Sequence, residues 1–414
     1  MIDLSSMGER AKLAERVLAT AGTALKNRAL EKIAERLIIN AEMIIGENKK
    51  DIATAREMGI AEQMIDRLML NEARIKAISD AVLQVAALDD PIGEVLDGFV
   101  RPNGLNIKKV AVPLGVIGII YESRPNVTVD AATLCLKSGN VAILRGGKEA
   151  FCSNNALCGV MRDALKSVGL PEDCVQLVTD TTRESATALM QLSALDVLIP
   201  RGGKGLIRSV VENSKVPVIE TGSGNCHVYV DEFADFDKAV KIVDNAKTQR
   251  VSVCNAAESL LVHEKIADKI LPLIKNALDK SSVEIRGCKR TKAILGESVV
   301  LATDEDYATE YNDYIISVKV VDSIDEAIDH IMKYTTGHSE SIVTENYTNA
   351  LKFTECVDAA AVYVNASTRF TDGGEFGFGA EIGISTQKLH ARGPMGLKQL
   401  TSMKYIVFGN GQIR

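Results

Sequence analysis

Three features are missing from the 414-residue sequence, and each absence excludes a class of protein. No apolar run approaches the about 18 residues that a membrane-spanning helix needs. The first residues lack the basic and apolar regions of an export signal. Metal-binding patterns such as C-x-x-C and H-E-x-x-H do not occur, so we expect no metal site. The sequence therefore predicts neither a membrane protein nor an exported one.

Long basic blocks and regular cysteine patterns are also absent. The net charge is -7 and the isoelectric point is near 5.5, which argues against nucleic acid or a membrane surface as the main partner. The eight cysteines are scattered and lie mostly in apolar runs. With the missing export signal, this distribution indicates reduced thiols and a cytoplasmic location.

The spacing of apolar residues indicates an α/β protein of two or three domains. Residues 5 to about 85 have the i, i+3, i+4 spacing of successive amphipathic helices. After them, short apolar runs typical of buried strands alternate with helical runs, as in βαβ units on a parallel sheet. The expected strands are residues 104–112, 116–121, 141–144, 175–178, 195–199, 259–263 and 360–364, and the expected helices about 128–137, 153–167 and 322–334.

The apolar run 405–408 predicts a further strand near the C-terminus. It has no evident partner in its own chain, and an exposed apolar strand edge promotes aggregation. Pairing with a second subunit would cover that edge, so we expect a homo-oligomer.

Two turns that follow predicted strands are rich in glycine and in basic residues. Residues 145–148 and 201–204 both read Arg-Gly-Gly-Lys, and right-handed crossovers would place them at the carboxyl edge of the sheet. Glycine lets the backbone approach a phosphate, and the cations neutralise it. Two such turns favour a nucleotide cofactor, although each could be only a tight turn. Farther along, residues 371–383 predict a glycine-rich loop over a site or on the plain surface.

A cysteine lies at a junction between elements. Cys254 follows a helix-like run and precedes the apolar strand at 259–263. Arg250 stands four residues before it, and a nearby cation lowers the pKa of a thiol. Cys254 is therefore a candidate nucleophile, and a buried structural cysteine is the alternative.

Five blocks of the sequence resemble the gamma-glutamyl phosphate reductase family, the glutamate-5-semialdehyde dehydrogenases, a divergent branch of the aldehyde dehydrogenase superfamily. These blocks are residues 121–128, 220–227, 249–258, 321–342 and 390–394. The resemblance covers nearly the whole chain. It implies an aldehyde dehydrogenase-like α/β fold in three parts. These are a Rossmann-like NADPH-binding domain (1–100 and 114–222), an α/β catalytic domain (223–393) and a small β oligomerisation flap (101–113 and 394–414).

The resemblance also implies a reaction. NADPH would reduce L-glutamate 5-phosphate to L-glutamate 5-semialdehyde in L-proline biosynthesis, with phosphate released through a thioester on Cys254. Functional pairing with a glutamate 5-kinase is the partnership that it suggests. One alternative is a non-phosphorylating NAD(P)-dependent aldehyde dehydrogenase with the same nucleophile. Another is a non-catalytic scaffold that keeps the fold.

Residue roles follow from the same resemblance. The backbone N–H of Cys254 would stabilise the oxyanion, with Asn126 as its partner if the loop is shifted, because counting from Gly139-Asn140 places Glu122 there instead. Glu220 has the spacing of the general-base glutamate of ordinary aldehyde dehydrogenases. The remaining candidates are Glu310 for the nicotinamide ribose, and Arg124, Arg250, His390 and Arg392 for the substrate.

The resemblance assigns the cofactor-binding turns as well. Arg145 takes the place of a lysine near the adenosine ribose, and Lys148 that of a glutamate which NAD-preferring members aim at the ribose hydroxyls. Cations there would attract a 2′-phosphate, so NADPH is expected over NADH. The glycines that would let the backbone approach the cofactor are Gly146, Gly147, Gly202 and Gly203.

Overall fold

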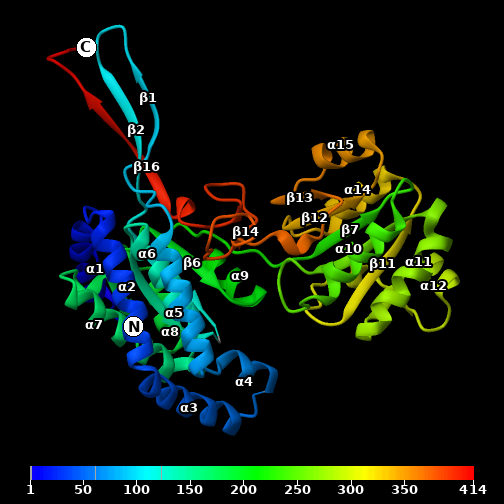
Figure 1. Ribbon diagram of the computed structural model, residues 1–414, viewed down its shortest axis with the longest axis horizontal. Helices are drawn as coiled ribbons and strands as arrows, with labels where there is room; N and C mark the ends of the chain where they lie inside the picture. The colour runs from blue at the N-terminus through cyan, green and yellow to red at the C-terminus, as the bar shows by residue number, and fades with distance from the viewer. Residues whose placement is uncertain (1, 61, 123) are drawn as a thin grey trace. The chain divides into compact units, whose positions relative to one another are not determined.

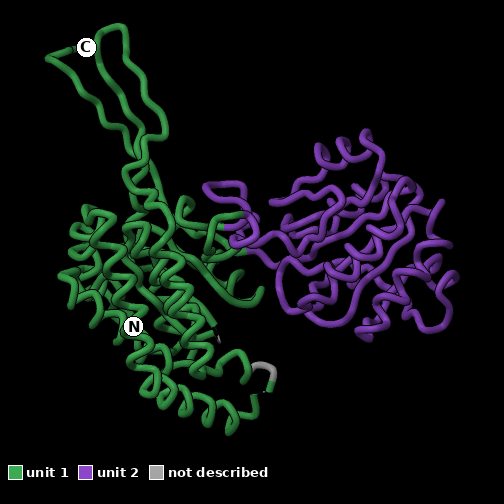
Figure 2. Tube along the Cα trace, in the orientation of Figure 1, with its two compact units in different colours: residues 1–221, 377–383, 395–414 green, residues 222–376, 384–394 purple. Residues whose placement is uncertain are grey.

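The computed structural model describes residues 2–60, 62–122 and 124–414 and divides the chain into two compact units. Unit 1 comprises residues 1–221, 377–383 and 395–414, and unit 2 comprises residues 222–376 and 384–394 (Figure 2). Ser123, in the loop predicted after the strand at 116–121, lies outside the described residues. No helix in the described part of the chain is long and apolar enough to cross a membrane.

Unit 1 combines a helical layer with two sheets (Figure 1). Its α-helices are α1 (Ser5–Leu18), α2 (Thr23–Ile39), α3 (Ala41–Glu57), α4 (Glu62–Leu68), α5 (Glu72–Ala87), α6 (Pro125–Lys137), α7 (Phe151–Ser167), α8 (Arg183–Met190) and α9 (Lys204–Asn213). Its strands are β1 (Val95–Val100), β2 (Asn106–Pro113), β3 (Val116–Tyr121), β4 (Val141–Gly146), β5 (Val175–Leu177), β6 (Val197–Arg201) and β16 (Thr401–Phe408). Short 3₁₀ turns are η1 (Lys148–Ala150), η2 (Glu172–Cys174) and η5 (Lys398–Leu400).

The predicted run of amphipathic helices is confirmed. Leu30, Ile33 and Leu37 of α2 are buried, as are Ile75 and Ile78 of α5, and the two helices pack together. Burying each large aliphatic side chain contributes about 1.5–3 kcal/mol to stability. The helices are therefore stabilised by tertiary packing more than by intrinsic helix propensity.

The four-stranded sheet of unit 1 is parallel, in the order β5-β4-β3-β6, and β3 is buried along its whole length. Tyr121 at the end of β3 pairs with Gly146 of β4 and Arg201 of β6, so the carboxyl ends of these three strands lie side by side. Both glycine-rich turns therefore meet at this edge.

Several predicted boundaries in this sheet and in the helix that follows β3 were wrong. Arg145 and Gly146 are the last residues of β4, and Pro200 and Arg201 the last of β6, so both turns begin later than predicted. Helix α6 begins at Pro125 and not near residue 128. Proline is favoured in the first turn of a helix, where its missing N–H needs no partner, so the predicted loop is shorter.

The second sheet of unit 1 is antiparallel, in the order β1-β2-β16, and forms a ribbon that projects from the unit (Figure 1). From its own residues the terminal strand has no evident partner in the chain, whereas the resemblance implies a flap that combines residues 101–113 and 394–414, and the structure confirms the pairing that the resemblance implies. Thr401 to Phe408 pair with Pro113 to Asn106 of β2. The outer strands nevertheless expose large apolar side chains: Val95, Leu96, Phe99, Val100, Met403, Tyr405, Val407 and Phe408.

Unit 2 has a seven-stranded parallel sheet in the order β10-β9-β11-β8-β7-β12-β13. Its strands are β7 (Cys226–Val230), β8 (Ala257–His263), β9 (Glu284–Gly287), β10 (Val300–Leu301), β11 (Ile315–Val321), β12 (Ser339–Val343) and β13 (Ala361–Val364), and a two-stranded sheet adds β14 (Ile384–Ser385) and β15 (Gly393–Pro394). The helices are α10 (Phe236–Thr248), α11 (Glu264–Leu278), α12 (Lys289–Leu295), α13 (Asp304–Tyr307), α14 (Ile324–Tyr334) and α15 (Tyr347–Cys356), with 3₁₀ turns η3 (Asp279–Ser281) and η4 (Thr368–Phe370).

Alternating side chains of the central strands bury both faces of this sheet. Leu260 and Val262 of β8 join the core that contains the apolar face of α10 and α11. Leu261 and Tyr229 join the core with α14 and α15 on the opposite face. Because successive side chains of a strand point to opposite faces, the position of each polar residue in β8 determines which pair of helices it faces.

We predict that the protein is a homo-oligomer and that deleting residues 401–414 separates it into single chains. The deletion uncovers the edge of β2 and removes much of the exposed apolar surface of the ribbon. Sedimentation velocity measures the change, with a matched variant that stops at Phe408 expected to sediment like the full chain. A folded 401–414 deletion with an unchanged sedimentation coefficient would contradict the prediction.

Candidate active site

Cys254 lies in the segment 249–256, which connects α10 to β8 at the amino end of that strand. Its half-buried thiol meets His338, with 3.1 Å between Sγ and Nε2 of the imidazole. His338 stands directly before β12, after Gly337, whose φ of 73° favours glycine. The two residues meet because β7 lies between β8 and β12, and the amino ends of the three strands are aligned.

His338 is buried and joined to a row of hydroxyl groups. Its Nδ1 lies 2.8 Å from Ser339 Oγ, which lies 2.6 Å from Thr371 Oγ1, and that hydroxyl lies 2.7 Å from the phenol of Tyr363. Burial lowers the pKa of His338 to about 4, so the imidazole is neutral at pH 7. A neutral imidazole can hold the thiol through a hydrogen bond and accept its proton briefly.

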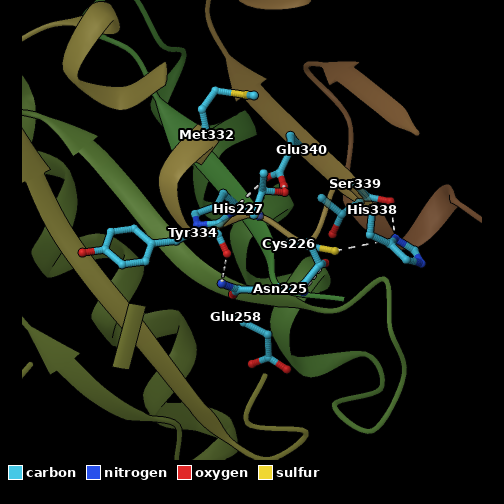
Figure 3. Close-up of polar contacts among 12 residues, drawn as sticks. Asn225, Cys226, His227, Glu258, Met332, Tyr334, His338, Ser339 and Glu340 are labelled. Carbon is cyan, nitrogen blue, oxygen red and sulfur yellow. Dashed lines mark hydrogen bonds and ion pairs between the residues drawn. The ribbon is translucent and has the colours of Figure 1, made fainter. Parts of the chain in front are cut away.

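Cys226 packs against the segment that carries Cys254. Its thiol donates to the carbonyl oxygen of Cys254 at 3.2 Å. The same thiol lies 3.8 Å from Nδ1 of His338 (Figure 3). Burial raises the pKa of Cys226 well above its usual value, so it stays protonated. It therefore holds the backbone of Cys254 as a protonated, uncharged thiol.

A loop after β13 holds the residue that follows Cys254. The amide of Asn255 donates to the carbonyl oxygens of Arg369 at 3.2 Å and Thr371 at 3.0 Å. In return, the hydroxyl of Thr368 donates to the carbonyl of Asn255 at 2.7 Å. These three bonds fix the backbone beside the thiol.

Two arginines lie close to this segment. Arg369 Nε donates to Gln249 Oε1 at 2.8 Å, which brings it beside Arg250. Burial, and then the charge of Arg250, lowers the pKa of Arg369. Two cations held together near a thiol favour the thiolate and attract an anion.

A buried ion pair lies between α10 and β8, next to the segment that carries Cys254. Glu258 shares the face of β8 that meets α10, so its carboxylate reaches Lys247 at 2.6 Å, with both side chains fully buried. Burial raises the pKa of Glu258 to about 7, and the cation of Lys247 opposes that shift. Glu258 also accepts from the N–H of Asn312 at 3.1 Å, while Glu310 accepts from the N–H of Gly224 at 2.8 Å. The pair thereby holds the loop that carries Glu310.

A second buried pair lies on the opposite face of the sheet. His227 Nδ1 is 3.0 Å from Glu340 Oε2 (Figure 3). The hydroxyl of Thr335 donates to the other oxygen of that carboxylate. His330 of α14 packs edge-on against Tyr307, with ring centroids 4.9 Å apart. Burial, and then the charges of His227 and Lys319, lowers the pKa of His330 to about 3.

Apart from Glu310, which lies in unit 2, the predicted cofactor residues gather in unit 1 near the carboxyl ends of β4 and β6. The N–H of Gly203, at the start of α9, donates to the carboxylate of Glu122 at 3.0 Å. Arg145 donates through Nη2 to the carbonyls of Thr181 and Thr182 at 2.7 and 2.8 Å. Its buried Nε has no partner among the described residues.

The other predicted residues are distributed over both units. Asn126 lies in the first turn of α6 and donates to Asp130 at 2.8 Å, and burial raises the pKa of Asp130 to about 6. In unit 2, Arg392 pairs with Asp358 at 2.8 Å, and His390 is exposed with a φ of 71°. The candidates divide as follows: Arg124, Asn126, Arg145, Gly146, Gly147, Lys148, Gly202, Gly203 and Glu220 belong to unit 1, and Arg250, Cys254, Glu310, His390 and Arg392 to unit 2.

Sequence reasoning missed His338 and Arg369. His338 falls within a motif that carried the resemblance, yet no role was predicted for it. The sequence did hold a signal for His338 in its position. Gly337-His338 stands directly before β12, much as Cys254-Asn255 stands shortly before β8. Aligned strand starts bring such pairs together.

The chain matches known proteins over its full length. A model described as "Aldehyde dehydrogenase family" matches residues 5–293. A gamma-glutamyl phosphate reductase of Clostridium perfringens (strain SM101) is 61% identical over 413 residues, covering 100% of this chain and 99% of that protein. One of Carboxydothermus hydrogenoformans is 61% identical over 415 residues, covering all of both. The crystal structure of a gamma-glutamyl phosphate reductase from Thermotoga maritima has a TM-score of 0.98 and 54% identity, covering 100% of each chain.

We predict that Gly224→Ala disturbs the nucleophile segment. A Cβ at Gly224 would overlap the backbone carbonyl group of Cys254, which cannot rotate away. Overpacking of this kind lowers the free energy of unfolding by about 1–3 kcal/mol. Urea unfolding measures this loss, and peptide mapping measures the rate at which iodoacetamide alkylates Cys254. Gly159→Ala is the matched control because nothing lies within 4 Å of its added carbon. A Gly224→Ala protein with wild-type stability and alkylation rate would refute the prediction.

The buried imidazole of His330 predicts a loss of stability in acid. Its pKa is about 3 when folded and 6.5 at its ordinary value, so below pH 6.5 the unfolded chain binds a proton that the folded chain does not. From pH 7 to pH 5 this difference lowers the free energy of unfolding by about 2 kcal/mol. His330→Phe, which keeps a ring against Tyr307, should remove that part of the pH dependence in urea unfolding. An unchanged pH dependence in the variant would count against it.

Proposed function

The chain belongs to the aldehyde dehydrogenase family, and we propose that it reduces L-glutamate 5-phosphate to L-glutamate 5-semialdehyde with release of phosphate, a step of L-proline biosynthesis. Within the family, the relatives that match it from end to end are gamma-glutamyl phosphate reductases. The observation that carries the proposal is the contact of Cys254 with a buried, neutral His338 beside two arginines.

The chemistry begins at the thiol. The thiolate of Cys254 attacks the acyl carbon, an S–C bond forms, the C–O bond to phosphate breaks, and phosphate leaves with that electron pair. A bound nicotinamide nucleotide supplies the hydride that reduces the resulting thioester. Collapse of the thiohemiacetal then breaks the C–S bond, releases the aldehyde and returns the thiolate.

His338 has a positioning role in this scheme and serves as a transient proton acceptor. Nε2 of its neutral ring lies 3.1 Å from Sγ of Cys254 and holds the thiol in place. The hydroxyl of Ser339 fixes the ring through Nδ1. The charges of Arg250 and Arg369, rather than a permanent imidazolium, favour the thiolate. Arg250, exposed at the end of α10, is suited to meet the phosphate of the substrate.

The remaining roles are proposals that rest on the family pattern. The N–H of Cys254 and the amide of Asn126 are the proposed donors to the oxyanion. Glu310 is proposed to bind the nicotinamide ribose; its carboxylate is held by the N–H of Gly224. Glu220 has no water to activate in a reaction that releases phosphate, so we assign it no proton transfer. Arg124, His390 and Arg392 stay candidates for binding the substrate.

A nicotinamide nucleotide suits the edge of the unit 1 sheet. The N–H of Gly203 already donates to a negatively charged group, the carboxylate of Glu122, so the start of α9 is suited to bind an anion. Lys148 begins η1 directly after Gly147, and Arg145 lies three residues earlier in β4, held by the carbonyl of Thr181. We infer that these cations favour NADPH over NADH. Gly146, Gly147 and Gly202 would allow the close approach of the backbone.

Three further features complete the proposal. We infer a homo-oligomer that buries the apolar ribbon, a cytoplasmic location, and pairing with a glutamate 5-kinase. The non-phosphorylating aldehyde dehydrogenase is the alternative reaction, and the naming of the full-length relatives favours the reductase.

The reverse reaction tests the proposed function. Glutamate 5-semialdehyde and NADP should give reduced cofactor only when inorganic phosphate is present, and Cys254→Ala should be at least 100-fold slower because it lacks the nucleophile. Absorbance of the reduced nicotinamide measures both rates. Phosphate-independent turnover by the wild type would establish the alternative reaction instead.

A charge reversal tests the cofactor preference. Lys148→Glu should weaken the preference for NADPH, because a carboxylate repels the 2′-phosphate and accepts hydrogen bonds from a free 2′-hydroxyl. A charged contact of this kind contributes about 1–3 kcal/mol, or roughly five- to 150-fold in discrimination. The ratio of kcat/KM for the two cofactors measures it. An unchanged ratio would mean that Lys148 does not contact the phosphate.

A further inference from the structure

The loop after β13 carries two charged side chains to which the proposed reaction assigns no contact with the substrate. Residues 367–372 include η4, and three hydrogen bonds join them to Asn255, the neighbour of the nucleophile. The side chains that this loop projects therefore keep a fixed place beside Cys254. Arg369 and Asp372 are the charged ones.

Arg369 is prepared to bind an anion. Its Nε donates to Gln249 at 2.8 Å. Among the described residues, no ion pair joins Arg369 or Arg250 to a carboxylate. The guanidinium is half buried. Burial and the neighbouring charge of Arg250 both disfavour its cation, and a bound carboxylate would offset both.

Asp372 gives the same loop an acid. Its Oδ1 accepts from the N–H groups of Gly374 at 2.8 Å and Glu375 at 3.4 Å, which fixes the carboxylate in a turn. Its charge also acts on Arg369. A site with both signs suits a zwitterion, because the acid repels a dianionic phosphate but attracts an ammonium group.

We propose that Arg369 binds the α-carboxylate of the substrate and that Asp372 binds its α-ammonium group. The proposal rests on the proposed function and adds the element of specificity to it. The loop would select an amino-acid aldehyde or acyl phosphate over a simple one, while Arg250 remains for the phosphate. Residue 371 of the same loop hydrogen-bonds through Oγ1 to Ser339, which couples the specificity loop to the positioning of His338.

The test compares two aldehydes in the reverse reaction. Wild type, Arg369→Gln, Asp372→Asn and the exposed control Arg16→Gln are assayed with glutamate 5-semialdehyde and with butanal, which lacks both charged groups. Asparagine keeps the turn acceptor of Asp372. We expect kcat/KM for the semialdehyde to fall roughly 10- to 150-fold in Arg369→Gln and Asp372→Asn. Because Arg369 also favours the thiolate, butanal turnover falls in Arg369→Gln as well, but by less, so the ratio of kcat/KM for the semialdehyde to kcat/KM for butanal should fall about tenfold or more in both variants. Butanal turnover in Asp372→Asn, the KM for phosphate in both variants, and both aldehydes in Arg16→Gln should stay within about twofold of wild type.

A measurement without turnover keeps the result decisive if butanal reacts too slowly. L-glutamate carries the same amino-acid end, so it should slow the alkylation of Cys254 by iodoacetamide in wild type and not in Arg369→Gln. Equal loss with both aldehydes, a raised KM for phosphate, or protection by L-glutamate that survives in Arg369→Gln would overturn the assignment. Wild type without phosphate-dependent turnover would instead contradict the proposed function itself.

Discussion

The contact between Cys254 and His338 depends on the register of three parallel strands. β7 pairs with both β8 and β12, and the paired residues keep their amino ends at one edge of the sheet. Two residues 84 apart in sequence are thereby held 3.1 Å apart between Sγ and Nε2. A slip of one residue in any of these strands would turn every side chain to the opposite face, so the buried pairs Lys247–Glu258 and His227–Glu340 also fix the site.

Burial decides how the site uses charge. Removing His338 from water keeps its imidazole neutral, which leaves hydrogen bonding as its main contribution. The positive charge comes from arginines on the segment before the thiol and on the loop after β13. Arginine retains its cation where histidine does not, because its ordinary pKa is far above neutrality. The site can therefore favour a thiolate and an anionic substrate together.

The sequence pattern predicted the features that depend on residues close together in the chain. Apolar spacing identified the helices of residues 5–87 and the buried strands, and the junction before β8 made Cys254 a candidate nucleophile. The start of α6 was misplaced because Pro125 can begin a helix as well as end a loop. His338, Arg369 and the pairing of β16 with β2 depend on register between distant segments, which no local spacing records. The resemblance to a family identified the reaction, while the contacts of Asn126, Arg145 and Arg392 needed the structure.

The central claim is that Cys254 carries the acyl group, and intact-protein mass spectrometry with peptide mapping tests it most directly. Enzyme mixed with glutamate 5-phosphate in the absence of reduced cofactor should gain the mass of one glutamyl group on the peptide that contains Cys254. Hydroxylamine, which cleaves thioesters, should remove that mass. Release of phosphate with no acyl group on Cys254, or with the group on another residue, would contradict the account.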